Sequence, residues 1–371
     1  METKKKGFPV AFWVCSCSEI FERLAYYLGR SLILIFVTAS VATGGLGLSD
    51  TVAANMQSNL TAFSYLLPLF GAVIVDKYIG ARYTTPVGMF IAAAGYFTGG
   101  IAKSATGVYV MIFLVSLGLA LFKNGAIIGR VITDKSQMDP AFSMRYTLVN
   151  VGAFIGTFLV GILYKDVFAK DGVLGFAPCF KMAALMMVLG GLWYIFVCWR
   201  FLGDLGKLPF KKTLTEEEKA AEAKKKEEAG TKQPLTTIEK KRIGAIFVAS
   251  LFSIVFWIFW YLGYMPVYFY WAENMDWVVA GYQVPSTWFD AANSLFCVIL
   301  GPVTAALWKK LAARPQGDMS LFRKTGLGIA IIGVGYLFYA AIDIMRGGEK
   351  ASVLWLIVFA FLLTMGEMFF S

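Results

Sequence analysis

Histidine is absent from the 371-residue sequence, and cysteine is scarce. The five cysteines lie far apart or in apolar segments, and none stands in a cluster with metal-ligand spacing: Cys15, Cys17, Cys179, Cys198 and Cys297. The sequence therefore predicts no metal site, no cofactor and no disulfide. Without histidine, any proton that the protein moves must be carried by carboxylates.

The signatures of common enzyme chemistry are also absent. We find no phosphate-binding glycine loop and no pairing of a nucleophile with a base. The sequence therefore predicts that the protein is not an enzyme.

Charged residues are few. They make up 16% of the chain, against roughly a quarter in soluble domains, while 58% of the residues are hydrophobic. Apolar runs of membrane-spanning length recur along the chain and predict an all-α polytopic protein in a lipid bilayer. We expect ten spans, at roughly residues 9–41, 56–75, 84–102, 107–131, 142–164, 176–202, 243–271, 286–308, 321–343 and 351–371.

Lysine and arginine are distributed unevenly among the loops between these runs. With the N-terminus inside, most loop cations fall on the inner side, as the positive-inside rule requires: Lys4 to Lys6, Lys77, Arg82, Arg130, Lys135, Arg145, Lys309, Lys310, Arg314, Arg323 and Lys324. We therefore expect a multi-pass protein of the plasma (inner) membrane with a cytoplasmic N-terminus. The net charge of +10 then reflects topology, and no basic-aromatic motif suggests a nucleic-acid partner.

One hydrophilic segment, residues 204–242, interrupts the apolar pattern. Its alternating acidic and basic runs are typical of a charged surface helix or solvated linker, with a binding tail as the less favoured alternative. It divides the chain into an N-terminal six-helix bundle (1–203), a cytosolic linker (204–242) and a four-helix bundle (243–371). Two bundles joined by such a linker are typical of secondary transporters.

A polar stripe runs along the first apolar segment. Its members recur at helical spacing and line one face over three turns: Glu19, Glu22, Arg23, Tyr26, Tyr27 and Arg30. Ionisable groups inside a membrane are costly unless they face a protein interior or a watery path, so the stripe predicts an ion or substrate route. The two tyrosines could instead simply pack between helices.

Other polar residues fall inside later spans. Lys123 and Glu367 lie deep in apolar runs, so we favour a functional role, although a lysine near a helix end could extend to the surface. Asn150 and Asn293 could bind a ligand or could equally link helices by hydrogen bonds.

Several motifs together resemble the proton-dependent oligopeptide transporters of the major facilitator superfamily, along residues 10 to 371. The first-helix pattern Glu19-x-x-Glu22-Arg23 with Tyr26-Tyr27 matches that family, with Leu24 in place of phenylalanine. A second match covers residues 71–82, which include Asp76, Lys77 and Arg82. Weaker matches are Phe122-Lys123-Asn124, residues 142–156 (where Arg145 and Thr147 depart), Pro285 to Asn293, Pro302 to Trp308, and Gly366-Glu367.

The resemblance implies a two-bundle fold and a proton-coupled symporter that imports di- and tripeptides by alternating access. It implies proton coupling through Glu19, Glu22, Arg23 and Glu367, and an inner gate of Asp76, Lys77 and Arg82. The implied peptide site comprises Tyr26, Tyr27, Arg30, Lys123, Asn150, Trp257, Asn293 and Glu367. Arg30 and Lys123 suit the carboxylate of the peptide, Glu367 its amine, and we expect a monomer.

Two departures from the family keep alternatives open. The Phe256-Trp257 region lacks the acidic residue that the seventh helix usually carries, and the chain has room for ten helices where the family has twelve. A carrier of another solute, such as an amino acid or nitrate, is one alternative. A truncated membrane protein that does not transport is the other.

Overall fold

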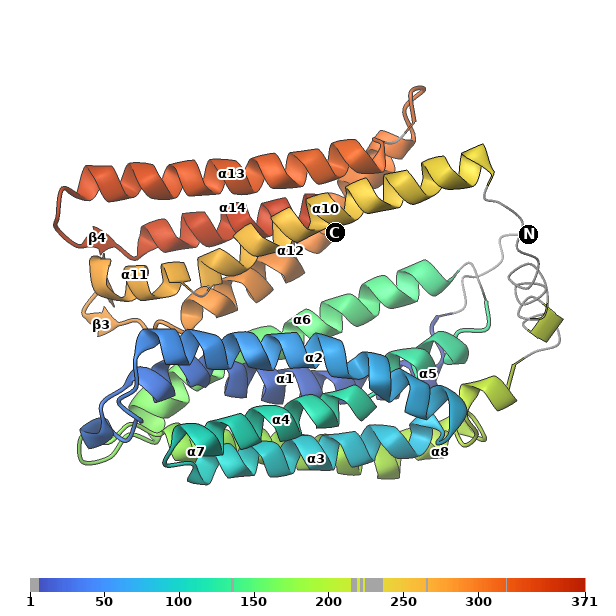
Figure 1. Ribbon diagram of the computed structural model, residues 1–371, viewed down its shortest axis with the longest axis horizontal. Helices are drawn as coiled ribbons and strands as arrows, with labels where there is room; N and C mark the ends of the chain where they lie inside the picture. The colour runs from blue at the N-terminus through green and yellow to red at the C-terminus, as the bar shows by residue number, and fades with distance from the viewer. Residues whose placement is uncertain are drawn as a thin grey trace. The chain divides into compact units, whose positions relative to one another are not determined.

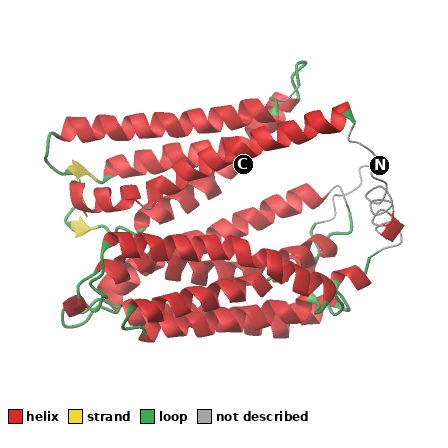
Figure 2. Ribbon diagram, viewed as in Figure 1, coloured by secondary structure: helices red, strands yellow, loops and turns green. Residues whose placement is uncertain are grey.

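The computed structural model describes residues 7–134, 137–214, 219–220, 223, 236–264, 266–317 and 319–370. These residues are almost entirely helical, with a few two-residue strands (Figure 2). They form two compact units. The first contains residues 1–209 and 276–299, and the second residues 210–275 and 300–371.

The first unit is built from long helices joined by short connections (Figure 1). Its helices are α1 (Val10–Thr38), α2 (Asp50–Lys77), α3 (Ala81–Ile101), α4 (Ala105–Leu121), α5 (Asn124–Val131), α6 (Met138–Ile162), α7 (Phe176–Trp193) and α8 (Trp199–Leu202). Short turns complete it: the 3-10 helix η1 (Val41–Thr43) and the π-helices η3 (Leu163–Val167) and η4 (Tyr194–Cys198). The strands β2 (Val278–Val279) and β3 (Tyr282–Gln283) pair in an antiparallel hairpin before α12 (Trp288–Ala312) begins.

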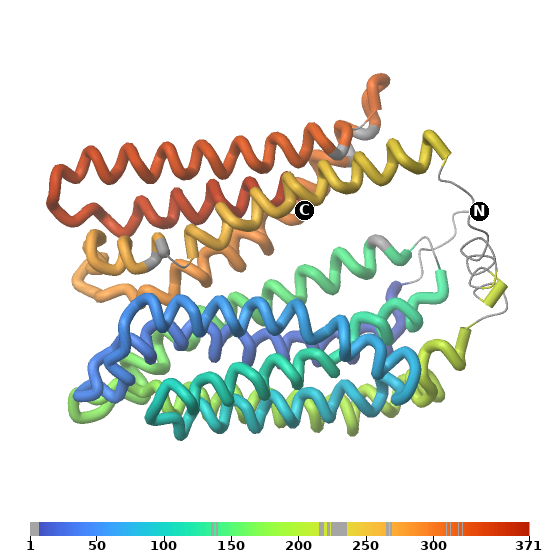
Figure 3. The backbone as a smooth tube through the Cα atoms, in the orientation of Figure 1, coloured from blue at the N-terminus to red at the C-terminus, as the bar shows by residue number. Residues whose placement is uncertain are grey.

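The second unit contains η5 (Phe210–Lys212), α10 (Thr237–Tyr264), α11 (Pro266–Asn274), α13 (Leu321–Arg346), β4 (Ala351–Ser352) and α14 (Leu354–Phe370), with the later half of α12. The strand β1 (Met275–Asp276) lies at the boundary between the units. Helices α13 and α14 run side by side (Figure 3). The triad of Tyr270, Asp343 and Arg346 joins α11 to α13, with Arg346 Nε 2.7 Å from Asp343 Oδ1.

Small residues allow the helices of the first unit to approach closely. A Cβ added to Gly88 of α3 would lie 2.4 Å from the Gly118 carbonyl oxygen, and a Cβ on Gly118 of α4 would lie 2.4 Å from the Gly88 carbonyl oxygen. Such mutual backbone contact is how helices associate where no hydrophobic effect drives them together. Helices α3 and α4 therefore form a tight pair.

Large apolar side chains on both units are exposed. Phe196 and Leu69 in the first unit are 73% and 66% exposed, and Phe247 and Leu337 in the second are both 73% exposed. Apolar surface of this kind suits the hydrocarbon region of a bilayer.

Seven helical stretches among the described residues are long and apolar enough to cross a membrane: Asp50–Lys77, Ala105–Val131, Pro140–Val167, Phe176–Leu202, Thr237–Asn274, Trp288–Trp308 and Phe322–Arg346. This confirms the predicted all-α polytopic fold. Among the remaining expected spans, α1 carries four ionisable residues and α14 has 17 residues. The expected count of ten spans stays a prediction.

The structure adds detail that the apolar pattern does not contain. The span expected at 107–131 is broken at Phe122 and Lys123 into α4 and α5. The expected division at residues 204 and 242 stays a prediction; the compact units differ from it because residues 276–299 pack with the first unit. Most of the charged run expected to form a surface helix lies outside the described residues.

Candidate functional site

The polar stripe of α1 lies inside the first unit. Glu19 and Glu22 are each 1% exposed and Arg30 is 6% exposed, although α1 is otherwise largely apolar. Buried charges in a membrane protein must be paired or face a cavity. The partners of these side chains therefore define what the stripe can do.

Glu22 and Arg23 form an ion pair along α1. Arg23 Nη2 donates to Glu22 Oε1 at 2.6 Å, and Arg23 Nε donates to Glu22 Oε2. The Arg23 guanidinium also lies 5.0 Å from the centre of the Tyr26 ring, in cation–π range. A two-point pair of this type is strong, and it brings together the carboxylate and the guanidinium that the sequence suggested for proton coupling.

Glu19 faces a different guanidinium, that of Arg145. Arg145 Nε lies 2.8 Å from the Glu19 carboxylate, and Asn124 Nδ2 donates to Glu19 Oε1 at 3.2 Å. Arg145 lies within α6, as the span expected at 142–164 predicts, and its side chain reaches α1. Sequence reasoning noted Arg145 as an inner-side cation and as a departure from a motif. It did not pair Arg145 with Glu19, since the spacing along one helix says nothing about a partner on another.

The start of α5 also holds the N-terminal half of α1. Asn124 Nδ2 donates to the Cys15 carbonyl at 2.7 Å, and Trp193 Nε1 of α7 donates to the Val14 carbonyl at 2.9 Å. Two other helices therefore bind consecutive backbone carbonyls of α1.

Lys123 stands at the break between α4 and α5. Its Nζ donates to the Pro68 carbonyl of α2 at 2.8 Å. The Pro68 carbonyl therefore solvates the positive charge of Lys123 with its dipole.

Arg30 faces Asp290, a residue that sequence reasoning did not single out. Arg30 Nη1 lies 3.9 Å from Asp290 Oδ2, and Ser31 Oγ donates to the same oxygen at 3.5 Å. The Arg30 guanidinium also lies 5.9 Å from the centre of the Tyr27 ring. The signal was present, because Asp290 is an acidic residue within the apolar run expected at 286–308.

The other residues of the expected peptide site in the first unit differ in how accessible they are to a ligand. Tyr26 and Tyr27 meet edge to face at 5.3 Å, with Tyr26 buried and Tyr27 half-buried. Asn150 Nδ2 donates to the Tyr146 carbonyl of its own helix at 3.0 Å. Asn293 is half-buried in α12. Tyr27 and Asn293 are thus more accessible to a ligand than Tyr26 or Asn150.

The expected inner gate lies where α2 ends and α3 begins. Asp76 and Lys77 end α2, while Arg82 donates to the carbonyls of Gly203 and Trp199, the latter at 3.1 Å. Arg82 therefore ties the start of α3 to both ends of the short helix α8. Close by, Lys207 Nζ lies 2.7 Å from Asp204 and lowers the pKa of that exposed carboxyl group by hydrogen bonding and charge.

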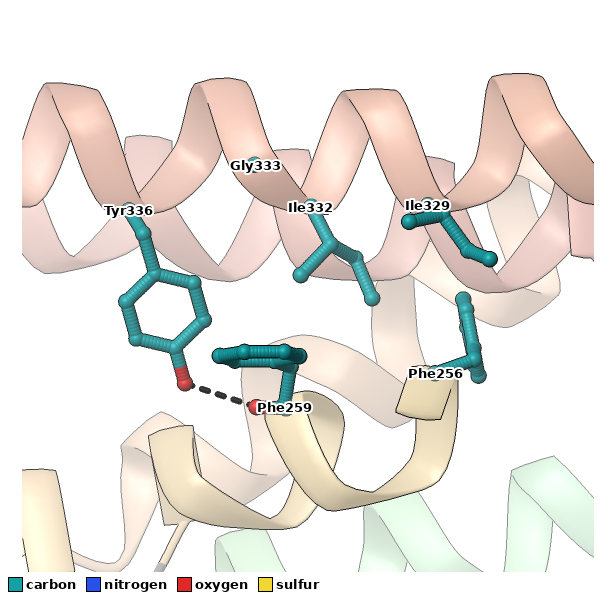
Figure 4. Close-up of a pocket in the computed structure, with 6 residues that line it drawn as sticks. All are labelled: Phe256, Phe259, Ile329, Ile332, Gly333 and Tyr336. Carbon is teal, nitrogen blue, oxygen red and sulfur yellow. Dashed lines mark hydrogen bonds between the residues drawn. The ribbon is translucent and has the colours of Figure 1, made fainter. Parts of the chain in front are cut away.

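Trp257 and Glu367 belong to the second unit. Trp257 contacts Trp260 edge to face at 5.5 Å and Phe370 at 6.4 Å, and Glu367 is 9% exposed in α14. A small cavity of about 150 Å³ lies nearby between α10 and α13 (Figure 4). Its lining is apolar apart from Tyr336, whose hydroxyl donates to the Phe259 carbonyl at 2.6 Å, and its volume is below that of typical ligand pockets.

Comparisons with known proteins place the chain among transporters. It is 23% identical to the uncharacterized transporter YclF of Bacillus subtilis (strain 168), over 98% of this chain and 80% of that protein. It is 24% identical to the peptide transporter YePEPT of Yersinia enterocolitica subsp. palearctica, with the same shares covered. Because these relatives are transporters, the prediction that the chain is not an enzyme is confirmed.

Comparison with a solved structure tests the predicted fold. A POT family transporter in complex with 5-aminolevulinic acid superposes with a TM-score of 0.85 at 22% identity, over 99% of this chain and 83% of that chain. This confirms the predicted major facilitator fold. A sequence model of the POT family matches residues 197–371, and with the relatives it confirms the resemblance to the POT family of transporters that the first-helix motif indicates.

Proposed function

We propose that the protein is a proton-coupled symporter that imports di- and tripeptides across the plasma membrane by alternating access. The observation that carries this proposal is the charge layout inside the first unit. Three carboxylates each face a guanidinium, namely Glu19 with Arg145, Glu22 with Arg23 and Asp290 with Arg30. Lys123 adds a cation that is held by a carbonyl.

A peptide suits such a layout because it is a zwitterion. Its carboxylate favours cations such as Arg30 and Lys123, which lie in the first unit, while its amine favours a carboxylate such as Glu367 in the second. A ligand that binds both halves stabilises the closed arrangement, as alternating access requires. The varied side chains of peptides need a roomy aromatic wall, to which Tyr27 and Trp257 would contribute.

Proton movement would use the carboxylates, since the chain has no histidine. Protonation of Glu22 would release Arg23 and loosen the charge network. Glu19 and Glu367 are the other carboxylates of this proposal, with the N-terminus cytoplasmic and Asp76, Lys77 and Arg82 at the inner gate.

A second solute class has specific support. The described Phe256–Tyr264 stretch of α10 contains no acidic residue, and one solved neighbour carries 5-aminolevulinic acid, which is not a peptide. A carrier of amino-acid-like solutes or small anions is therefore the alternative.

Uptake into proteoliposomes separates the two. With an inward proton gradient, the purified full chain should accumulate labelled dialanine at least about tenfold over protein-free liposomes, because ion-coupled carriers concentrate their substrate. Excess unlabelled dialanine should compete, and 5-aminolevulinic acid or nitrate should compete less. Accumulation of nitrate or 5-aminolevulinic acid with no uptake of dialanine would establish the alternative.

A further inference from the structure

Asp290 is an acidic residue in the first turn of α12, at the start of an otherwise apolar membrane span. Its side chain is 19% exposed, and the polar groups that face it are Arg30 and Ser31 of α1. An ionisable residue within a span is costly to retain, so its partner and position suggest a role in transport.

The residues just before Asp290 pack against α6. A Cβ at Gly161 would come within 2.8 Å of Pro285 and of Trp288, so this part of the chain occupies space that only glycine leaves open. The Trp288 ring stacks on Phe158 at 4.6 Å, and its Nε1 donates to the Phe158 carbonyl at 3.0 Å. These contacts hold the first turn of α12 against the first unit.

A second group of contacts holds the hairpin that precedes α12. The Tyr282 hydroxyl donates to Asp166 Oδ2 at 2.9 Å, and Lys165 Nζ donates to the Gln283 carbonyl at 2.6 Å. Because the segment 282–290 is anchored along its length, the position of its carboxylate opposite Arg30 is set by packing and does not depend on the ion pair alone.

The ion pair of Asp290 is the longest of the three described ion pairs that involve α1. Arg30 and Asp290 are separated by 3.9 Å, whereas Glu19 lies 2.8 Å from its guanidinium and Glu22 is bound at two points. A carboxylate held at this distance forms a weaker pair than a hydrogen-bonded one. An incoming anion would therefore separate this pair more readily than the other two.

We propose that Asp290 is a further proton-coupling residue: a substrate carboxylate that binds Arg30 replaces Asp290, and the displaced carboxylate then takes up one proton. This inference rests on the proposed function. The proton comes from water on the open side and forms one O–H bond, and it returns to water when the substrate leaves and Arg30 faces Asp290 again. A largely buried carboxylate that loses its cation favours the neutral form, and the α6 residues against which the neighbouring Trp288 packs, Phe158 and Gly161, carry no charge.

Calorimetry of the purified full chain tests this. Titration of dialanine in two buffers of different ionisation enthalpy gives the protons taken up per peptide, which we expect to be about one for the wild type by linkage. Dialanine amide lacks the carboxylate, so the protein should take up far fewer protons when it binds this ligand. Asp290→Asn should abolish the uptake seen with dialanine, and Asp290→Glu should restore it. The control Glu273→Gln changes an exposed carboxylate on α11 and should match the wild type.

The outcomes separate this inference from the proposed function. Equal proton uptake for Asp290→Asn and wild type would overturn the role of Asp290 while peptide binding stands. Equal proton uptake on binding of dialanine and of dialanine amide would also overturn the role of Asp290. This comparison needs only the wild-type protein, so it holds even if Asp290→Asn fails to fold. A wild type that binds no dialanine would overturn the proposed function and this inference together.

Discussion

At the scale of single residues, the interior of the first unit depends on which guanidinium each carboxylate faces. Glu19 is almost fully buried and lies against Arg145, which is itself 31% exposed in its side chain. Removal of one partner leaves a buried charge without compensation, which is more harmful than removal of both. This asymmetry makes the pair testable.

Arg145→Leu should destabilise the protein by about 3 kcal/mol, the lower end of the range for a broken buried pair, since Arg145 is partly exposed. The double variant Arg145→Leu with Glu19→Gln should recover part of that loss. Unfolding of Arg145→Leu, of Glu19→Gln and of the double variant in detergent, followed by circular dichroism, measures both effects. Strictly additive losses would show that the two side chains do not interact.

Glu22 offers a second test at this scale. Glu22→Gln keeps a hydrogen-bonding side chain of the same size beside Arg23 but cannot titrate. We expect gradient-driven accumulation of dialanine to fall by about tenfold or more, and exchange across the membrane without a gradient to fall much less. Accumulation at the wild-type rate would remove Glu22 from the coupling mechanism.

At the scale of elements, close helix contact decides stability. The backbones of α3 and α4 meet at Gly88 and Gly118, where an added Cβ would lie 2.4 Å from a carbonyl oxygen. No flexible side chain can move aside there, because the obstructing atom belongs to the backbone. The two helices must separate to admit any larger residue.

Gly88→Val should therefore lower the melting temperature in detergent by about 5 °C or more, in line with overpacking of a tight interface. Gly244→Ala is the matched control, because an added Cβ meets nothing within 4 Å at that helical position. The control should melt at or slightly above the wild-type temperature, since alanine favours a helix more than glycine does. Equal melting of both variants would contradict the role given to the α3–α4 contact.

Within one helix the sequence could predict the polar residues, but it could not predict their partners on other helices. The stripe from Glu19 to Arg30 was visible because one helix has a fixed period, and the structure buries Glu19, Glu22 and Arg30 as expected. The partners Arg145 and Asp290 lie on other helices, 126 and 259–260 residues away from α1 positions, and no local period encodes such distances. The break at Lys123 was also hidden, since the apolar run continues through it.

At the scale of the whole molecule, the predicted topology is the quantity to test. Lys170 follows α6 and η3, while Asp204 follows α8, and both are exposed. With a cytoplasmic N-terminus, the first lies outside and the second inside. In a background without the five native cysteines, Lys170→Cys should react with an impermeant maleimide in intact cells. Asp204→Cys should react only after permeabilisation, and the reverse pattern would invert the topology.

The hydrogen bonds that anchor α1 affect the order in which side chains and helices move. Asn124 and Trp193 bind the carbonyls of Cys15 and Val14, so rotation of α1 about its own axis would break hydrogen bonds to two other helices. Exchange of partners along the polar stripe is then expected to proceed through side-chain rotamers, which change within picoseconds to nanoseconds in exposed residues, while helices shift within microseconds to milliseconds. Charge rearrangement around α1 should therefore reach equilibrium before each slow movement of the protein begins.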